Sequence, residues 1–295
     1  MKPCLWILLG IFLSLDAQAA LTVRDDTGRP VELPQPARRI VSLAPHTTEL
    51  LYAAGAGDYV VGAVDYSDYP EAAKALPRVG SGAALDLEAI LALRPDLVVG
   101  WQNGNPVAVL DKLQSLGVAL FRSEPHKLED VASDLRALGH LAGTDATAEA
   151  ASKNYLARLQ QLRARYSGKT PVTVFFQIWH QPLMTINGEH LISQVIELCG
   201  GVNVFAAQPA LVPKLDVEAV LAADPQAIIT GERASHPDWR QDWQRWPSLR
   251  AVRDGFLFDV NPDVLQRHTP RLLQGAEELC ELLARVREHA QPSRN

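Results

Sequence analysis

The amino-acid sequence predicts an α/β protein of two similar lobes with mainly parallel sheets, joined by one long rigid helix and enclosing a cleft. Three observations support this fold class. The chain of 295 residues is long enough for two domains of ordinary size. One 16-residue segment occurs twice, once in each half. Short apolar runs alternate with amphipathic segments along most of the remainder.

The first 19 residues have the pattern of a secretory signal peptide. Lys2 is followed by an apolar run at 5–15 and by the small-x-small sequence 17–19. The run is too short for an ordinary transmembrane helix. Cys4 precedes the run, whereas a lipidated cysteine would follow it. We therefore expect cleavage after Ala19 and an exported, soluble mature protein.

The repeat links residues 85–100 to residues 215–230 at a constant offset of 130, with seven identical residues. The second residue of each copy is an aspartate, Asp86 or Asp216, that can cap a short amphipathic helix. Each copy ends in an apolar run that is typical of a buried strand. Further strands are predicted at 39–44, 60–64, 118–121, 172–178, 184–186 and 256–260, and helices at 47–54, 107–116, 128–141, 191–199 and 270–288.

A long helix is predicted between the two copies of the repeat. Apolar residues recur from Ala148 to Tyr166 at spacings of three and four, Thr144 or Asp145 can cap the start, and Gly168 can end it. An ordinary crossover helix within one domain is the alternative. Because no flexible Gly/Ser linker is present, we expect the lobes to move little. The predicted units are a signal peptide (1–19), an N-terminal lobe (20–143), a linking helix (144–167) and a C-terminal lobe (168–295).

Composition and motifs exclude several classes of function. A net charge of −6 argues against general electrostatic binding of nucleic acid. The eight histidines form no metal-binding motif, and the sequence holds no phosphate-binding loop or nucleophile elbow. We therefore predict neither a catalytic site nor a metal site.

Two cysteines remain after removal of the signal peptide, Cys199 and Cys280. In an oxidising compartment we expect them to form a disulfide. It would close a loop of about 80 residues and contribute up to about 4 kcal/mol in the chain-entropy model. The alternative is a pair of buried free thiols.

Several segments resemble the helix-linked substrate-binding proteins of ABC importers, which carry cobalamin, iron siderophores or haem. The family likeness rests on DTGRPV at 26–31, RIVSLAP at 39–45 and TELL at 48–51. Likeness to the cobalamin-binding members rests on DYSDYP at 65–70, RPDLV at 94–98 with Trp101, ELCGGVNVF at 197–205 and LC at 279–280.

The resemblance implies a protein that captures cobalamin (vitamin B12) or a related corrinoid in the periplasm. It would deliver this ligand to an inner-membrane ABC permease with its ATPase, be a monomer when free, and have neither enzymatic activity nor a cofactor of its own. A binding protein for an iron siderophore or haem is the alternative. An enzyme resembling the nitrogenase-type metalloproteins is disfavoured by the export signal and the missing cluster-binding cysteines.

A corrinoid has broad apolar faces and a rim of amides, so it requires aromatic platforms and a few hydrogen-bonding groups. Tyr66, Trp101 and Trp179 each lie near the end of a predicted strand, where open α/β sheets bind ligands. Each could instead be a packed core aromatic. The cobalamin-binding members carry tryptophans where this chain has Gly82 and, nearby in sequence, Val212.

By resemblance, the loop that contacts the corrin consists of Asp263, Val264, Leu265, Gln266 and Arg267. Its acidic and basic groups could serve the ligand's amides, or could form a surface ion pair.

Two histidines, His46 and His180, could approach a metal centre or be structural. Glu88 and Glu218 occupy the same place in the two repeats, within the first helical turn. There they either interact only with the helix dipole or, as the resemblance implies, dock onto arginines of the permease.

Overall fold

A computed structural model describes residues 20–231 and 236–290, so the predicted signal peptide lies outside the described residues. The N-terminal lobe, called lobe one, contains a parallel sheet of order β4-β3-β5-β6 beside an antiparallel hairpin, β1-β2. Its elements are β1 (Leu21–Arg24), β2 (Pro30–Leu33), β3 (Ile40–Ser42), α1 (Pro45–Ala53), η1 (Gly57–Tyr59), β4 (Val60–Ala63), η2 (Glu71–Ala75), α2 (Leu87–Ala92), β5 (Leu97–Trp101), α3 (Val107–Ser115), β6 (Leu120–Ser123) and α4 (Asp130–Ala142).

The C-terminal lobe, called lobe two, contains a second parallel sheet of order β10-β7-β11-β12 and a small hairpin, β8-β9. The predicted α/β fold with two parallel sheets is confirmed. The elements of lobe two are β7 (Val172–Gln177), β8 (Trp179–His180), β9 (Leu183–Met184), α6 (Leu191–Leu198), β10 (Gly201–Asn203), α7 (Val217–Ala223), β11 (Ala227–Thr230), α8 (Trp239–Gln244), α9 (Arg250–Arg253), β12 (Leu257–Asp259), α10 (Pro262–Leu265) and α11 (Leu272–Ala290).

Both faces of each sheet are buried, as expected of parallel strands. In β5, Leu97 and Val99 belong to a core that runs through both lobes, while Val98 faces a separate core of lobe one. In β11, Ile229 faces the shared core and Ile228 a separate core of lobe two. The alternation explains why these strands have continuous apolar sequences.

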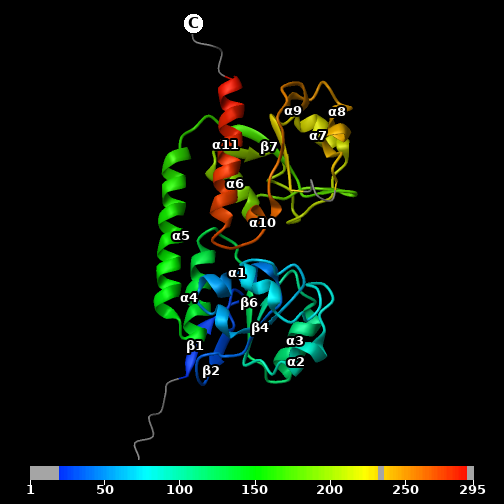
Figure 1. Cartoon of the computed structure of the whole chain (residues 1–295). Helices are drawn as coiled ribbons and strands as arrows, with labels where there is room; N and C mark the ends of the chain where they lie inside the picture. Colours follow the sequence, from blue (N-terminus) through cyan, green and yellow to red (C-terminus); the bar gives the residue numbers. More distant parts are fainter. Residues whose placement is uncertain (1–19, 232–235, 291–295) are drawn as a thin grey trace, which may run out of the picture.

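Helix α5 (Asp145–Tyr166) connects the lobes and lies along both of them (Figure 1). Its buried face includes Tyr155, whose hydroxyl donates a hydrogen bond of 2.7 Å to the carbonyl oxygen of Leu128. Arg158 forms an ion pair with Glu277 of α11, which ties the helix to lobe two. The helix is therefore fixed to both lobes by packing and polar contacts.

The ends of several elements differ from the sequence predictions. Thr144 precedes α5, but its hydroxyl donates to the carbonyl oxygen of Ala54 instead of capping the helix. Asp86 caps α2 by accepting a hydrogen bond from the amide of Ala89 at 2.9 Å, whereas Asp216 makes no such bond. The strand predicted at 184–186 overlaps the observed strand β9 (Leu183–Met184) only at Met184, and the hairpin β1-β2 and strand β10 were not predicted.

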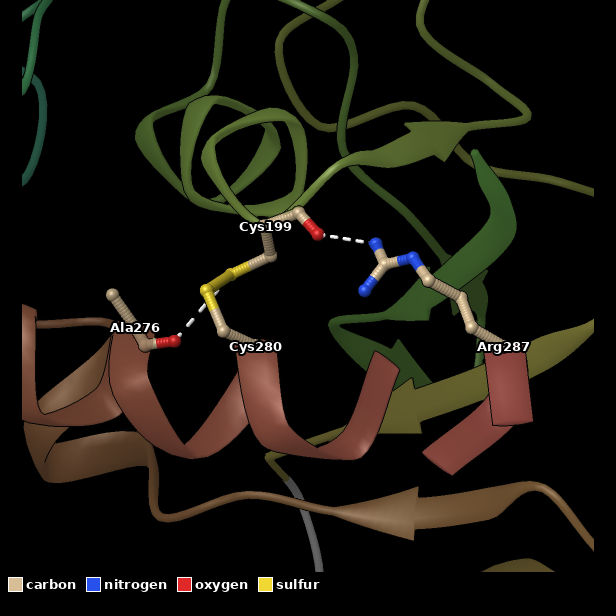
Figure 2. The surroundings of a disulfide bond; sticks show 4 residues. All are labelled: Cys199, Ala276, Cys280 and Arg287. Atoms are coloured by element: carbon tan, nitrogen blue, oxygen red, sulfur yellow. Dashed lines mark hydrogen bonds between the residues drawn. A yellow bond between two sulfur atoms is a disulfide. The ribbon is translucent and has the colours of Figure 1, made fainter. Parts of the chain in front are cut away.

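The predicted disulfide is confirmed. Cys199 follows α6 and is bonded to Cys280 of α11, and both residues are fully buried (Figure 2). Beside the bond, the guanidinium of Arg287 donates hydrogen bonds to the carbonyl oxygens of Cys199 and, at 2.7 Å, Thr170. This corner of lobe two is thus held by a covalent bond and a buried cation together. Within residues 20–231 and 236–290, no helix is long and apolar enough to cross a membrane.

Candidate functional site

The carboxyl ends of the two parallel sheets face each other where the lobes meet. His46, just after β3, contacts the ring of His268 in lobe two, with ring centroids 5.6 Å apart. The carbonyl oxygen of Tyr66, after β4, accepts a hydrogen bond from Arg267, which follows β12. Strand ends of this kind are where open α/β sheets bind ligands.

Tyr66 is the most exposed of the three predicted aromatic residues. Its side chain is 79% exposed. Its backbone has a φ of 63°, in the left-handed region that a non-glycine residue seldom adopts. Arg267 bonds its carbonyl oxygen, so the surrounding structure holds this conformation. The phenol ring is thus presented to solvent from a constrained turn.

Trp101 is the last residue of β5 and is half-buried. Its ring contacts that of His46 edge-on at 5.2 Å and packs on the backbone of Gly104. A Cβ atom at Gly104 would lie 1.8 Å from the indole, which explains the glycine. Trp101 therefore packs against His46 and Gly104 within lobe one and is only partly exposed.

Trp179 lies in β8, separated by one residue from the end of the inner strand β7, and is 44% exposed. Its neighbour His180 stacks on His236 with ring centroids 4.2 Å apart, and His236 is paired with Asp242 at 2.7 Å. A cavity of about 290 Å³ opens beside them. It is lined by Gln177, His180, Leu183, Val217, His236, Trp239, Asp242, Trp243, Arg245 and Trp246.

Trp239 and Trp243 are buried in the core of lobe two, while Trp246 is 39% exposed at the cavity.

The loop expected to contact the ligand forms the short helix α10. Asn261 caps it by accepting a hydrogen bond from the amide of Asp263 at 2.9 Å. Val264 and Leu265 are buried, because this side of α10 packs against α11. Their buried side chains support the loop from within lobe two.

Three carboxylates surround Arg267, whose side chain is 13% exposed. It contacts Glu49 at 2.9 Å, Asp68 at 2.8 Å and Asp263 at 2.7 Å. Glu49 also contacts Arg271 at 3.0 Å. We call this group of residues, with the backbone of Tyr66, the junction network. The contacts of Arg267 with Glu49 and Asp68 connect lobe two to lobe one. The sequence analysis considered a surface ion pair but not these contacts between the lobes.

Burial and charge act against each other in the junction network. Burial raises the pKa of Glu49, and the hydrogen bond and charge of Arg267 with the charge of Arg271 oppose that rise only in part. Burial also disfavours the ionised form of Asp68, but the hydrogen bond and charge of Arg267 bring the net pKa of Asp68 below its usual value. Arg267 is paired with carboxylates from both lobes, and Arg271 with one carboxylate of lobe one.

The histidines at the junction are buried and kept neutral. Burial, the neighbouring His268 and the charge of Arg267 lower the pKa of His46 well below its usual value. Burial, with His190 and His126 nearby, lowers the pKa of His268 to about 4. Nε2 of His46, Nδ1 of His268 and Nε1 of Trp101 are buried without a hydrogen-bond partner among the described residues.

Gly82 lies in a roomy environment. A Cβ atom there would have Asn105 Nδ2 as its nearest neighbour, at 3.9 Å. Gly82 also accepts a hydrogen bond from that amide group through its carbonyl oxygen. The position therefore accommodates a Cβ atom in ordinary van der Waals contact. Val212 lies in lobe two, in the segment before α7, and is half-buried.

Glu88 and Glu218 are both exposed in the first turns of α2 and α7. The two helices lie on the side of the molecule away from α5 (Figure 1). Neither carboxylate forms an ion pair with another residue in the part of the chain that the structure describes. Among those same residues, no group of three or more His, Cys, Asp or Glu side chains could hold a metal ion.

The fold and the facing sheet ends define a two-lobe binding protein. The chain belongs to the periplasmic binding protein family, whose sequence pattern matches residues 40–264. It is 39% identical over 251 residues to the vitamin B12-binding protein of Vibrio cholerae, covering 85% of this chain and 90% of that protein. It is 38% identical over 252 residues to the vitamin B12-binding protein of Yersinia pestis, covering 85% of this chain and 88% of that protein.

Solved structures give the same picture. The crystal structure of the periplasmic vitamin B12-binding protein of Vibrio cholerae matches with a TM-score of 0.80 at 38% identity, covering 86% of this chain and 99% of that one. The periplasmic heme-binding protein of Roseiflexus matches with a TM-score of 0.76 at 25% identity, covering 85% and 99%. A periplasmic heme-binding protein of Pseudomonas aeruginosa matches with a TM-score of 0.71 at 29% identity, covering 83% of this chain and 91% of that one. The relatives are binding proteins.

Proposed function

We propose that this protein captures cobalamin, or a related corrinoid, in the periplasm and delivers it to an inner-membrane ABC permease with its ATPase. The observation that carries the proposal is the pair of exposed aromatic rings, Tyr66 and Trp179, on facing sheet ends of the two lobes. The identity to vitamin B12-binding proteins over most of the chain supports it. No catalytic step is part of this function.

The charges at the junction favour a neutral ligand over an anionic one. A haem carries carboxylates and many siderophores are anionic, so their sites supply uncompensated cations. Here Arg267 is already paired with three carboxylates and Arg271 with Glu49. The buried His46 and His268 are neutral at pH 7. Exposed aromatic faces with compensated charges suit the apolar faces and amide rim of a corrinoid.

We place Tyr66, Trp101 and Trp179 against the corrin, with Asp263, Gln266 and Arg267 along its edge. Val264 and Leu265 belong to the same loop and support it through their packing between α10 and α11. In the mature protein, cleaved after Ala19, residues 20–143 and 168–295 act as the two ligand-binding lobes and 144–167 as their rigid link.

Titration with cyanocobalamin tests the ligand, with binding followed through tryptophan fluorescence and the corrin absorption spectrum. Tyr66→Ala and Trp179→Ala should each weaken binding about thirtyfold, because each removes a large aromatic contact. Leu116→Ala is the matched control, since Leu116 is exposed to a similar extent, 48%. It lies at the end of α3 and should leave affinity unchanged.

Two results would refute the assignment: wild-type affinity in both aromatic variants, or protein purified from its native host carrying the absorption spectrum of haem or a ferric chelate.

We further propose that Glu88 and Glu218 dock the loaded protein onto the permease. The two-fold symmetry of a permease dimer could offer one basic group to each repeat-related carboxylate. The double charge reversal Glu88→Arg/Glu218→Arg should leave cobalamin affinity and thermal stability nearly intact while abolishing transport in a reconstituted importer.

Glu32→Arg/Glu288→Arg is the control, because it makes the same change of charge at two other exposed positions. It should transport normally. Undiminished transport by the Glu88/Glu218 variant would leave these residues with a helix-end role alone.

A further inference from the structure

Glu49 is a buried carboxylate that serves two cations of the opposite lobe. It lies in α1 of lobe one, its side chain is 2% exposed, and a single oxygen, Oε1, accepts from Nη1 of Arg267 at 2.9 Å and Nη1 of Arg271 at 3.0 Å. Both arginines lie between α10 and α11 of lobe two. Removing the carboxylate's charge would leave two cations near one another without their shared partner.

Each arginine held by Glu49 also holds the aromatic segment 66–69. Arg267 pairs with Asp68 at 2.8 Å and donates to the carbonyl oxygen of Tyr66. The guanidinium of Arg271 lies over the ring of Tyr69, 3.9 Å from its centroid. The turn that presents Tyr66 is thus stabilised from the opposite lobe, by side chains that Glu49 positions.

Arg267 also fixes the other edge of the site, because it contacts Asp263 at the start of α10 at 2.7 Å. Only 13% of the Arg267 side chain is exposed, so most of its surface contacts the other residues of the junction network and little of it is accessible to a ligand. One buried carboxylate, Glu49, is therefore connected through Arg267 and Arg271 to both the aromatic turn of lobe one and the loop of lobe two.

We propose that Glu49 is a positioning residue of the cobalamin site: it holds Arg267 and Arg271 so that the 66–69 turn and the 263–267 loop are in place before the ligand arrives. The inference rests on the proposed function. Glu49 itself need not touch the ligand. When the network is broken, fewer molecules have the binding-competent arrangement, and the apparent affinity falls by that fraction.

The test begins with Glu49→Gln, which keeps the size of the side chain and removes its charge. If about a tenth of the molecules remain competent, the dissociation constant for cyanocobalamin should rise about tenfold. Two controls make matched changes elsewhere. Asp224→Asn neutralises a carboxylate bonded to Arg250 within lobe two, and Gln194→Ala removes a different inter-lobe contact, to His126 and Leu128. Both should bind as wild type.

A double-mutant cycle separates positioning from simple loss of stability. If Glu49 acts through Arg267 and Arg271, then Glu49→Gln should weaken binding less than about twofold in an Arg267→Gln/Arg271→Gln background. Equal effects of Glu49→Gln in both backgrounds would overturn the proposal.

Amide hydrogen exchange of the ligand-free protein provides a readout that does not depend on the ligand's identity. Peptides covering 64–70 and 262–269 should exchange faster in Glu49→Gln, with the remaining chain unchanged. Unchanged exchange in these peptides, or a general increase along the chain, would overturn the positioning role. If wild-type protein bound no cyanocobalamin, the proposed function would fall, and hydrogen exchange would still decide whether Glu49 orders the two segments.

Discussion

Removal of the Cys199–Cys280 bond should destabilise the protein strongly, and the size of the effect follows from the chain. The bond joins residues 81 apart in sequence. In the chain-entropy model, a loop of this length corresponds to about 4.5 kcal/mol at 25 °C. Alanine is the appropriate replacement because both cysteines are fully buried, and a serine hydroxyl would need a hydrogen-bond partner there. We expect the double variant Cys199→Ala/Cys280→Ala to lose about 4 kcal/mol of unfolding free energy.

The assay is equilibrium unfolding in urea, followed by circular dichroism, on wild type and the double variant. Wild-type protein unfolded and refolded with reductant is a second measurement, and should approach the stability of the double variant because the same cross-link is missing. A loss below about 1 kcal/mol in both would refute the reasoning, since it would mean that the cross-link does not restrict the unfolded chain.

Two further predictions concern buried titratable groups. Burial and the neighbouring carboxylate of Asp26 raise the pKa of Asp134 well above its usual value. Its ionisation therefore costs stability as the pH rises, and Asp134→Asn should gain about 1 kcal/mol of unfolding free energy in urea at pH 8 but little at pH 4. A loss at pH 8 would contradict this. Acidification from pH 6.5 to pH 4 should lower the stability of the Asp134→Asn protein through its buried histidines, measured in the same way.

The fold was predictable because its signals are local or repeated. The offset of 130 between the two α→β units revealed the two lobes, and the spacing of apolar residues located α5. Where a prediction was wrong, a longer-range contact overrode the local pattern. Thr144 has the side chain of a helix cap, but its hydroxyl bonds the carbonyl oxygen of Ala54, 90 residues away.

The candidate site was predictable only in part, for the same reason. Strand ends indicated Tyr66, Trp101 and Trp179 as residues near the facing edges. The burial of Val264 and Leu265 depends on the packing of α10 against α11, which no local pattern shows. The sequence did not indicate the contacts of Glu49 with Arg267 and Arg271, because these arginines lie 218 and 222 residues away from it along the chain.

The buried histidines show what such long-range contacts do to stability in acid. Burial lowers the pKa of His190 to about 4, and its Nδ1 accepts a hydrogen bond from the amide of Ile192, which requires that nitrogen to be unprotonated. His268 has a pKa of about 4 as well, and the pKa of His46 is also low. Because these values lie below the usual 6.5, the stabilisation is complete above about pH 6.5 and is lost as the pH falls toward 4.

The Asp134→Asn background is the right one for the measurement, since the raised pKa of Asp134 would otherwise act in the opposite direction. Adding His190→Asn keeps an acceptor for the amide of Ile192 and removes one titrating group. The double variant should therefore lose less unfolding free energy between pH 6.5 and pH 4 than Asp134→Asn alone. Equal losses in the two proteins would show that His190 does not contribute to the acid sensitivity and would contradict this prediction.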